Sequence, residues 1–287
     1  MSAADFSLDV PTIDADDVLT LADPRFEPGS VAIVTGAASG VGEACAVALA
    51  LNGLTVVGAD VDADGMAETG TVIDDVDAPG RFVALETDLT DDDDVEALVA
   101  AAADRGELRY VANVAGVQHI APIPEFPMKQ YDFLVDLMLR APFLVAKHAM
   151  THIRETDDGV GAIANMSSVH GHLATRDKSA YVTAKHGLTG LTRSIAAEGE
   201  GTLRSFTVSV GYVLTPLMRD QIADTARERG ISEREVVEEV MLGPARTKAL
   251  MTPLEVANLF TFGFSRHGRH LNGGDLCFDG GYTTTYE

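Results

Sequence analysis

Short apolar runs alternate along the chain with longer segments in which apolar and small residues recur at helical spacing. Each run is too short for a helix and leads into a polar or glycine-rich segment, which predicts a buried strand ending in a loop. The runs lie at residues 31–34, 55–59, 82–85, 110–112, 162–166 and 276–278. This alternation is typical of an α/β fold, a doubly wound parallel sheet with helices on both faces, in which ligands bind beyond the carboxyl ends of the strands.

Two segments fall outside this alternation. Residues 1–29 hold scattered acids and three prolines without sustained periodicity, and we expect an N-terminal extension before one domain at residues 30–287. Residues 215–253 have no strand pattern, but residues 218–229 and 233–241 have the pattern of charged helices around Gly230. We expect a helical lid at residues 215–253, placed to close over the carboxyl ends of the strands.

Length and composition narrow the class of protein. A chain of 287 residues with 46% hydrophobic content suits one sizeable core. The apolar stretch at residues 41–59 is interrupted by Glu43 and Asn52, and no basic region precedes an apolar segment at the N-terminus, so we expect a cytoplasmic protein with no membrane partner. Cys45 and Cys277 have no metal-binding spacing, and we expect both to be core residues and no metal to be bound.

The charge of the chain is strongly unbalanced. The net charge is −23, and only 5 of the 21 basic residues are lysines. Such a chain repels itself unless salt screens its charges, which favours a halophilic cytoplasm of high salt and a solvated acidic surface. Binding of nucleic acid is disfavoured for the same reason.

A glycine-rich turn follows the first predicted strand. Gly36, Gly40 and Gly42 precede a predicted helix at about residues 43–51, whose first amides could bind a pyrophosphate. The next strand ends at Asp60, eighteen residues after Gly42. A carboxylate there can accept hydrogen bonds from ribose hydroxyls and would repel a 2′-phosphate, which favours NAD over NADP. The alternatives are an ordinary tight turn and one more acid in an acidic chain.

A tyrosine and a lysine lie four residues apart in a later helical segment. Tyr181 and Lys185 therefore share one helix face, where a nearby ammonium would favour the phenolate and bring the tyrosine into the range of proton transfer. Ser168, at the end of the run 162–166, could reach the same substrate oxygen. The alternative is a surface aromatic residue beside a solvated lysine.

The motifs together resemble those of the short-chain dehydrogenase/reductase family over about residues 30–283. They are Thr-Gly-x-x-x-Gly-x-Gly at 35–42, Asn-x-Ala-Gly at 113–116, Ser168 and Tyr181-x-x-x-Lys185. The resemblance implies a Rossmann sheet of about seven strands, a single catalytic domain and a homotetramer. It implies that Ser168 holds the substrate oxygen, that Tyr181 is the acid/base, and that Lys185 lowers the pKa of Tyr181. It also implies cofactor contacts at Gly36, Ser39, Gly40, Val41, Gly42, Asp60, Asp88, Leu89, Asn113, Ala115, Tyr181, Lys185, Val213 and Thr215.

Four longer strings, at residues 115–123, 168–171, 178–181 and 211–217, are similar to those of the D-3-hydroxybutyrate dehydrogenase subfamily. The similarity implies a small anionic substrate, (R)-3-hydroxybutyrate, whose carboxylate is bound by Gln118, His170, Lys178 and Gln221. An amide, an imidazole and an ammonium do offer hydrogen-bond donors and positive charge to an anion. The alternatives are another small hydroxy acid or sugar-derived alcohol as substrate, and a solvated role for His170 and Lys178.

The chain departs from the family pattern at three positions. Met138 stands where the family usually has an asparagine whose helix kink exposes a backbone carbonyl, Val210 replaces the proline before Gly211, and Val114 lies within Asn-x-Ala-Gly. These departures leave open a weakly catalytic, NAD-binding regulator. Retention of Ser168, Tyr181 and Lys185 favours the enzyme.

Overall fold

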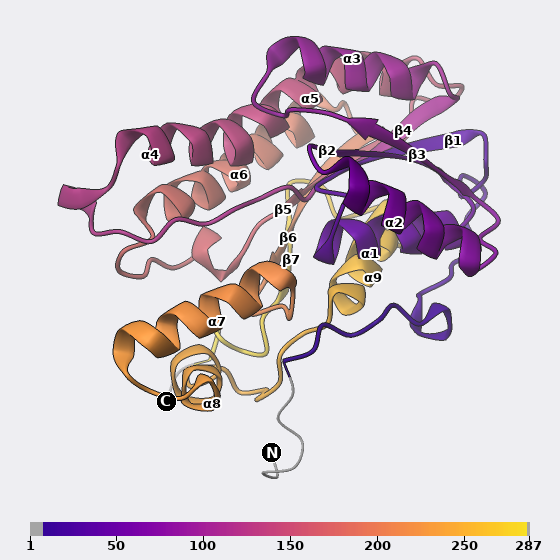
Figure 1. The fold of residues 1–287 in the computed structure, drawn as a ribbon. Coiled ribbons are helices and arrows are strands. Elements are labelled where there is room, and N and C mark those ends of the chain that lie inside the picture. Colours follow the sequence, from indigo (N-terminus) through magenta and orange to yellow (C-terminus); the bar gives the residue numbers. More distant parts are fainter. Residues whose placement is uncertain (1–7, 286–287) are drawn as a thin grey trace.

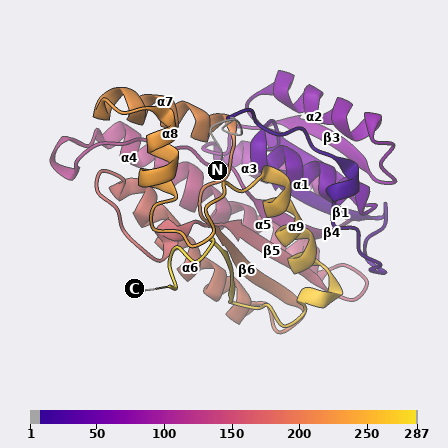
Figure 2. The ribbon, with the colours of Figure 1, turned by 90° about the horizontal axis from the view of Figure 1, so that it is seen from below.

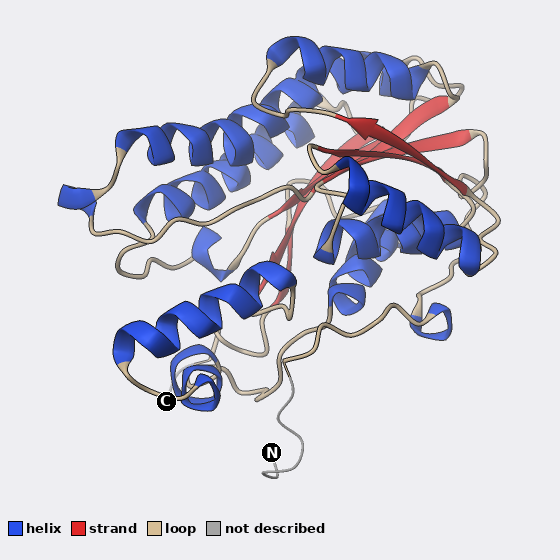
Figure 3. Ribbon diagram, in the orientation of Figure 1, coloured by secondary structure: helices blue, strands red, loops and turns tan. Residues whose placement is uncertain are grey.

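A seven-stranded parallel sheet in the order β3-β2-β1-β4-β5-β6-β7 forms the centre of the computed structural model, which describes residues 8–285 (Figures 1 and 3). The predicted fold class is confirmed. The sequence pattern located every strand except β6. The strands are β1 (Ser30–Thr35), β2 (Thr55–Asp60), β3 (Arg81–Glu86), β4 (Glu107–Asn113), β5 (Gly161–Met166), β6 (Leu203–Val210) and β7 (Asp275–Phe278).

Helices cover both faces of the sheet because successive side chains of a strand point to opposite sides. In β1, Ala32 and Val34 belong to the core beneath α1 and α9, whereas Val31 and Ile33 belong to the core beneath α3 and α5. Figure 2 shows α9 beside α1 on one face. The helices are α1 (Gly40–Leu51), α2 (Ala63–Asp75), α3 (Asp92–Ala103), α4 (Met128–Val135), α5 (Ala141–Arg154), α6 (Ser179–Glu198), α7 (Pro216–Arg229), α8 (Glu233–Glu235) and α9 (Pro253–Phe264).

The strand order reverses between β1 and β4, which lie side by side although two strands separate them in sequence. In such a sheet the loops after these two strands diverge to opposite faces and leave a crevice at the carboxyl edge. The glycine turn follows β1, and the Asn-x-Ala-Gly segment follows β4. The sheet therefore brings these two sequence motifs to one place.

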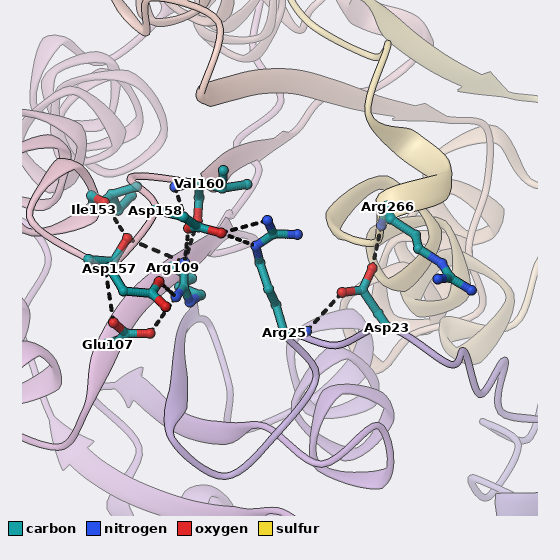
Figure 4. A network of polar contacts seen from close by, with 10 residues as sticks. Asp23, Arg25, Glu107, Arg109, Ile153, Asp157, Asp158, Val160 and Arg266 are labelled. Atoms are coloured by element: carbon teal, nitrogen blue, oxygen red, sulfur yellow. Dashed lines mark hydrogen bonds and ion pairs between the residues drawn. The ribbon is translucent and has the colours of Figure 1, made fainter.

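The described part of the N-terminal extension, residues 8–29, is docked on the domain. The Leu19 amide donates to Asn258 Oδ1 of α9 over 2.8 Å, and the Leu21 amide donates to Asn52 Oδ1 over 2.8 Å. Arg25 forms an ion pair with Asp158 at 2.6 Å (Figure 4). Backbone and side-chain contacts thus hold an extension whose sequence has no periodic pattern.

The segment after β6 is helical, as its pattern indicates. Helix α7 ends at Arg229 and is capped by Gly230, whose φ of 65° is the left-handed value that glycine adopts readily. Helix α8 begins with a capping box at Ser232 and continues as π-helix over Val236–Met241. Met218 of α7 and Val236 belong to a small apolar cluster of this segment, so the lid candidate has a core of its own.

The predictions that Cys45 and Cys277 are core residues have different outcomes. Cys45 is fully buried in α1, as expected, but Cys277 is exposed. The expectation for Cys277 was wrong because β7 is the edge strand of the sheet, which leaves part of its surface uncovered. No helix within residues 8–285 has both the length and the apolar character needed to span a bilayer.

Candidate active site

A cavity of about 390 Å³ lies at the carboxyl edge of the sheet. Loops after β1, β2, β3, β4, β5 and β6 contribute to its walls, together with α6 and α7. The predicted site residues that line it are Gly36, Ser39, Gly40, Val41, Gly42, Asp60, Asp88, Leu89, Ala115, Gln118, Ser168, His170, Lys178, Tyr181, Lys185, Val213, Thr215 and Gln221.

The glycine turn forms one end of the cavity. Gly36 has a φ of 72°, and a Cβ atom on Gly42 would lie 1.8 Å from the Gly36 carbonyl oxygen, so neither position accommodates another residue without rearrangement. Ser39 precedes α1, and its side chain makes no capping hydrogen bond to the described residues. The first amides of α1 therefore remain available to an anionic ligand, and this end of the cavity fits the phosphates of a dinucleotide.

Asp60 ends β2 beside this turn. Its Oδ2 atom accepts a hydrogen bond from the Ala38 amide over 3.2 Å, and its Oδ1 atom accepts one from the Asp62 amide over 3.1 Å. Each carboxylate oxygen can accept a further hydrogen bond. The carboxylate is thus held at the rim of the cavity, where it can accept hydrogen bonds from ribose hydroxyls.

Asn113 does not line the cavity, contrary to the expected cofactor contact. Its side chain is buried, and Nδ2 donates to Asn165 Oδ1 over 2.8 Å. The Asn165 amide in turn donates to Thr192 of α6 over 2.9 Å. The sequence pattern places Asn113 at the end of β4 but does not decide which way its side chain points. This buried chain of amides connects β4, β5 and α6 behind the catalytic residues.

Ser168 and Tyr181 meet across the cavity. Ser168 follows β5, and its hydroxyl accepts a hydrogen bond from the His170 amide over 3.2 Å. It also hydrogen-bonds to the hydroxyl of Tyr181, which lies in the first turn of α6. The ammonium of Lys185 is 5.4 Å from the centre of the Tyr181 ring and donates to the Met166 carbonyl over 2.7 Å.

Burial shifts the pKa values of both Tyr181 and Lys185. Burial raises the pKa of Tyr181, and the hydrogen bond with Ser168 opposes that shift only in part. Burial also lowers the pKa of Lys185 to about 8. In the chain alone, desolvation therefore outweighs the expected lowering of the Tyr181 pKa by Lys185. Desolvation penalises the charged forms of both groups, and the ammonium is directed at the Met166 carbonyl.

The expected carboxylate-binding residues also lie together. Gln118 Nε2 is buried and has no hydrogen-bond partner among residues 8–285. Burial lowers the pKa of Lys178 to about 8, so this side chain is an ammonium at neutral pH. Burial, reinforced by the charges of Lys178 and His186, lowers the pKa of His170 to about 4. His170 is therefore neutral, and the positive charge beside it comes from Lys178.

Of the three departures from the family pattern, Val114 and Val210 line the cavity and Met138 does not. Met138 is 1% exposed and lies within the π-helical turn Asp136–Arg140, which joins α4 to α5. In a π-helical turn each backbone amide bonds to the carbonyl five residues earlier instead of four. The helix is therefore irregular at this point even though residue 138 is not an asparagine. Val210 lines the cavity. The Val114 amide donates to Thr35 Oγ1 over 2.9 Å and helps to fix the loop after β4.

Tyr212 lines the cavity, although no sequence pattern assigned it a role. It follows β6, and its ring makes an edge contact with Tyr282 at 6.2 Å between centroids. Burial raises its pKa above the usual value, so its hydroxyl is a neutral donor and acceptor. Its position after a strand was the available signal, but the pattern missed β6.

Comparison with known protein families matches residues 36–283 to a family described as enoyl-(acyl carrier protein) reductase. A D-beta-hydroxybutyrate dehydrogenase of Rhizobium meliloti is 37% identical over 256 residues, which cover 88% of this chain and 98% of that protein. A cis-4-hydroxycyclohexanecarboxylate dehydrogenase of Sinomonas cyclohexanicum is 36% identical over 256 residues, covering 88% and 96%. A D-threitol dehydrogenase of Mycolicibacterium smegmatis is 32% identical over 257 residues, covering 89% and 93%.

Two solved structures, of a reductase and of a putative dehydrogenase, have folds similar to that of this chain. A levodione reductase has a TM-score of 0.84 and 28% identity, covering 91% of this chain and all of that chain. A putative NAD(P)-dependent gluconate 5-dehydrogenase from Beutenbergia cavernae with bound NADP has a TM-score of 0.80 and 25% identity over the same shares. The family match over most of the sequence and the relative at 37% identity establish that this chain belongs to the short-chain dehydrogenase/reductase family of nicotinamide-dependent oxidoreductases.

Proposed function

We propose that the protein is an NAD-dependent dehydrogenase that interconverts (R)-3-hydroxybutyrate and acetoacetate in the cytoplasm. The observation that carries this proposal is the buried Gln118 amide, which lines the cavity and lacks a partner in residues 8–285. A buried donor without an acceptor costs about 1–3 kcal/mol, and a bound carboxylate would remove that cost. The Lys178 ammonium lines the same cavity and supplies the charge that an anion requires.

The roles of the catalytic side chains follow from their positions. When bound, NAD would accept a hydride from the substrate carbon that carries the hydroxyl group. The Ser168 hydroxyl would hold the substrate oxygen, and the Tyr181 phenolate would take the hydroxyl proton. Because burial favours the neutral phenol, Tyr181 alone is suited to donate a proton to acetoacetate, and oxidation requires a cation that stabilises its phenolate. Lys185 is placed to be that cation.

Turnover of the acid and of its methyl ester tests the carboxylate site directly. We expect Lys178→Ala to lower kcat/KM for 3-hydroxybutyrate by about 10- to 100-fold, since a charge-assisted hydrogen bond contributes about 1.5–3 kcal/mol. Activity on the ester should change little. Lys147→Ala is the matched control, because it removes the same charge from an exposed position on α5. An unchanged acid-to-ester ratio in Lys178→Ala would contradict the proposal.

The same ratio should depend on pH in the wild type. The ammonium of Lys178 is present below a pKa of about 8 and is lost above it. Since kcat/KM reports ionisations of the free enzyme, the acid-to-ester ratio should be high below about pH 8 and fall above it toward the value of Lys178→Ala. Ionisation of Tyr181 and Lys185 affects acid and ester alike and cancels in the ratio.

A second candidate is a dehydrogenase of another small hydroxy acid or of a sugar-derived alcohol. The relatives that act on cis-4-hydroxycyclohexanecarboxylate and on D-threitol support it, because the family chemistry is retained while the substrate changes. A larger hydroxy acid would still use Lys178, whereas a polyol would not. A substrate panel measured in wild type and Lys178→Ala separates these alternatives.

We also propose NAD as the preferred cofactor and a homotetramer as the working assembly. The proposal for NAD rests on the Asp60 carboxylate at the rim of the cavity. The proposal for a tetramer rests on membership of the family, and light scattering of the purified protein tests it.

A further inference from the structure

We propose that His172, Asp275 and Cys277 form a binding site for a divalent transition metal of the zinc type, outside the catalytic cavity. Their ligand atoms, a ring nitrogen, a carboxylate oxygen and the thiol sulfur, all lie within 4.8 Å of one another. None of the three lines the catalytic cavity.

The fold brings these residues together from distant parts of the sequence. Asp275 and Cys277 are two residues apart on β7, so their side chains point to the same side of the strand. His172 follows the short helical turn Val169–Gly171, which begins directly after Ser168. Strand β7 lies at the edge of the sheet (Figure 1), and His172 and Cys277 are exposed in the single chain.

The carboxylate is held in place by neighbouring hydroxyl groups. Asp275 Oδ1 accepts hydrogen bonds from Thr207 Oγ1 over 2.6 Å and from Ser209 Oγ over 2.8 Å. Its other oxygen, Oδ2, lies 2.9 Å from Nε2 of His172. Metal-binding carboxylates are commonly oriented by such outer hydrogen bonds. The Cys277 sulfur lies 3.5 Å from Thr283 Oγ1, a weak contact that a metal bond would replace.

The donor set selects among metals. One nitrogen, one oxygen and one sulfur suit zinc and similar ions, whereas magnesium and calcium prefer oxygen ligands alone. Three protein ligands leave a fourth tetrahedral position to water. Binding requires the Cys277 thiolate, so each ion bound releases a proton. The bound metal would join the loop after Ser168 to β7 and stabilise the arrangement of both.

Cobalt(II) is the probe that tests this site, because thiolate ligation gives it a near-ultraviolet charge-transfer band. The full-length protein, freed of metal with a chelator, should bind Co²⁺ with this band and lose the band when Zn²⁺ is added. Cys277→Ser should abolish the band, and Cys45→Ser should retain it, since Cys45 is buried in α1. Circular dichroism of both variants checks that they are folded.

His172→Gln provides a second variant in which the thiol is intact. It should lower the affinity for Zn²⁺ by at least about tenfold, measured by competition with a chromogenic chelator. Zn²⁺ should raise the thermal unfolding midpoint of Cys45→Ser but not that of His172→Gln. Absence of the cobalt band in the wild type, or its persistence in folded Cys277→Ser, would overturn the proposal.

Discussion

At the scale of single residues, burial decides the protonation states in the cavity. It favours the neutral forms of Tyr181 and His170, so these two groups bear no charge in the chain alone. Burial also lowers the pKa values of Lys178 and Lys185 to about 8, but both side chains remain mostly ammonium at neutral pH. The cavity therefore combines a neutral acid/base group with two cations, Lys185 beside Tyr181 and Lys178 at the proposed carboxylate site.

Removal of the Tyr181 hydroxyl should remove the proton carrier. We expect Tyr181→Phe to lower kcat by about 10²- to 10⁴-fold, the usual contribution of general acid/base catalysis. Binding of NAD, measured by calorimetry, should be largely retained because the ring remains in place. Turnover at the wild-type rate in this variant would rule out Tyr181 as the acid/base.

Asp60 should determine the choice of cofactor. Asp60→Ala removes the carboxylate that accepts ribose hydroxyls and repels a 2′-phosphate. The ratio of kcat/KM with NAD to kcat/KM with NADP should fall by at least about tenfold, on the basis of 1.5–3 kcal/mol for a charged hydrogen bond. Asp62→Ala is the control, since this neighbouring acid caps α2 and does not line the cavity. Equal ratios in wild type and Asp60→Ala would refute the assignment.

At the scale of elements, a buried arginine joins strands and loops far from the active site. Arg109 of β4 bonds to Glu107 and Asp157 and forms an ion pair with Asp158 at 2.7 Å (Figure 4). Arg25 binds the same Asp158 from the N-terminal extension. The two arginines differ in environment, because the side chain of Arg109 is 4% exposed and that of Arg25 is 30% exposed.

This difference predicts unequal losses of stability. Arg109→Met leaves three carboxylates without their shared buried partner, and we expect it to lower the free energy of unfolding by about 2 kcal/mol, less than for a fully buried pair because the acids are partly exposed. Arg25→Met should cost less than about 1 kcal/mol, as expected for a solvent-screened pair. Denaturant unfolding of both variants provides the comparison. A larger loss in Arg25→Met would show that attachment of the extension matters more than the buried network.

At the scale of the whole molecule, the net charge of −23 opposes the approach of an anionic substrate. Lys178 acts at short range inside the cavity, where screening by salt is weaker than between surface charges. The global repulsion and the local attraction therefore respond differently to salt.

We expect the acid-to-ester ratio of kcat/KM to rise several-fold between about 0.1 M and 1 M salt, as the Debye length falls from about 10 Å to about 3 Å. Circular dichroism at each concentration separates this effect from salt-dependent folding. A ratio that is constant in salt while the protein remains folded would show that long-range repulsion does not limit the reaction.

Local sequence patterns determined much of this protein. Apolar runs of three to five residues locate most of the strands because a buried parallel strand requires continuous apolar side chains. The glycines of the turn, the carboxylate at the end of β2 and the spacing of Tyr181 and Lys185 are likewise properties of a few neighbouring residues. They sufficed to predict the fold class, and the family resemblance implied most of the other predicted residues that line the cavity.

Only the tertiary structure decided the properties that depend on packing between distant segments. The burial that makes His170 neutral and the orientation of Asn113 toward Asn165 depend on elements far apart in the sequence. The meeting of His172 with Cys277 depends on the strand order, which places β7 next to β6 at the edge of the sheet. Desolvation and side-chain direction arise from the assembled surroundings of a residue, and no short stretch of sequence contains them.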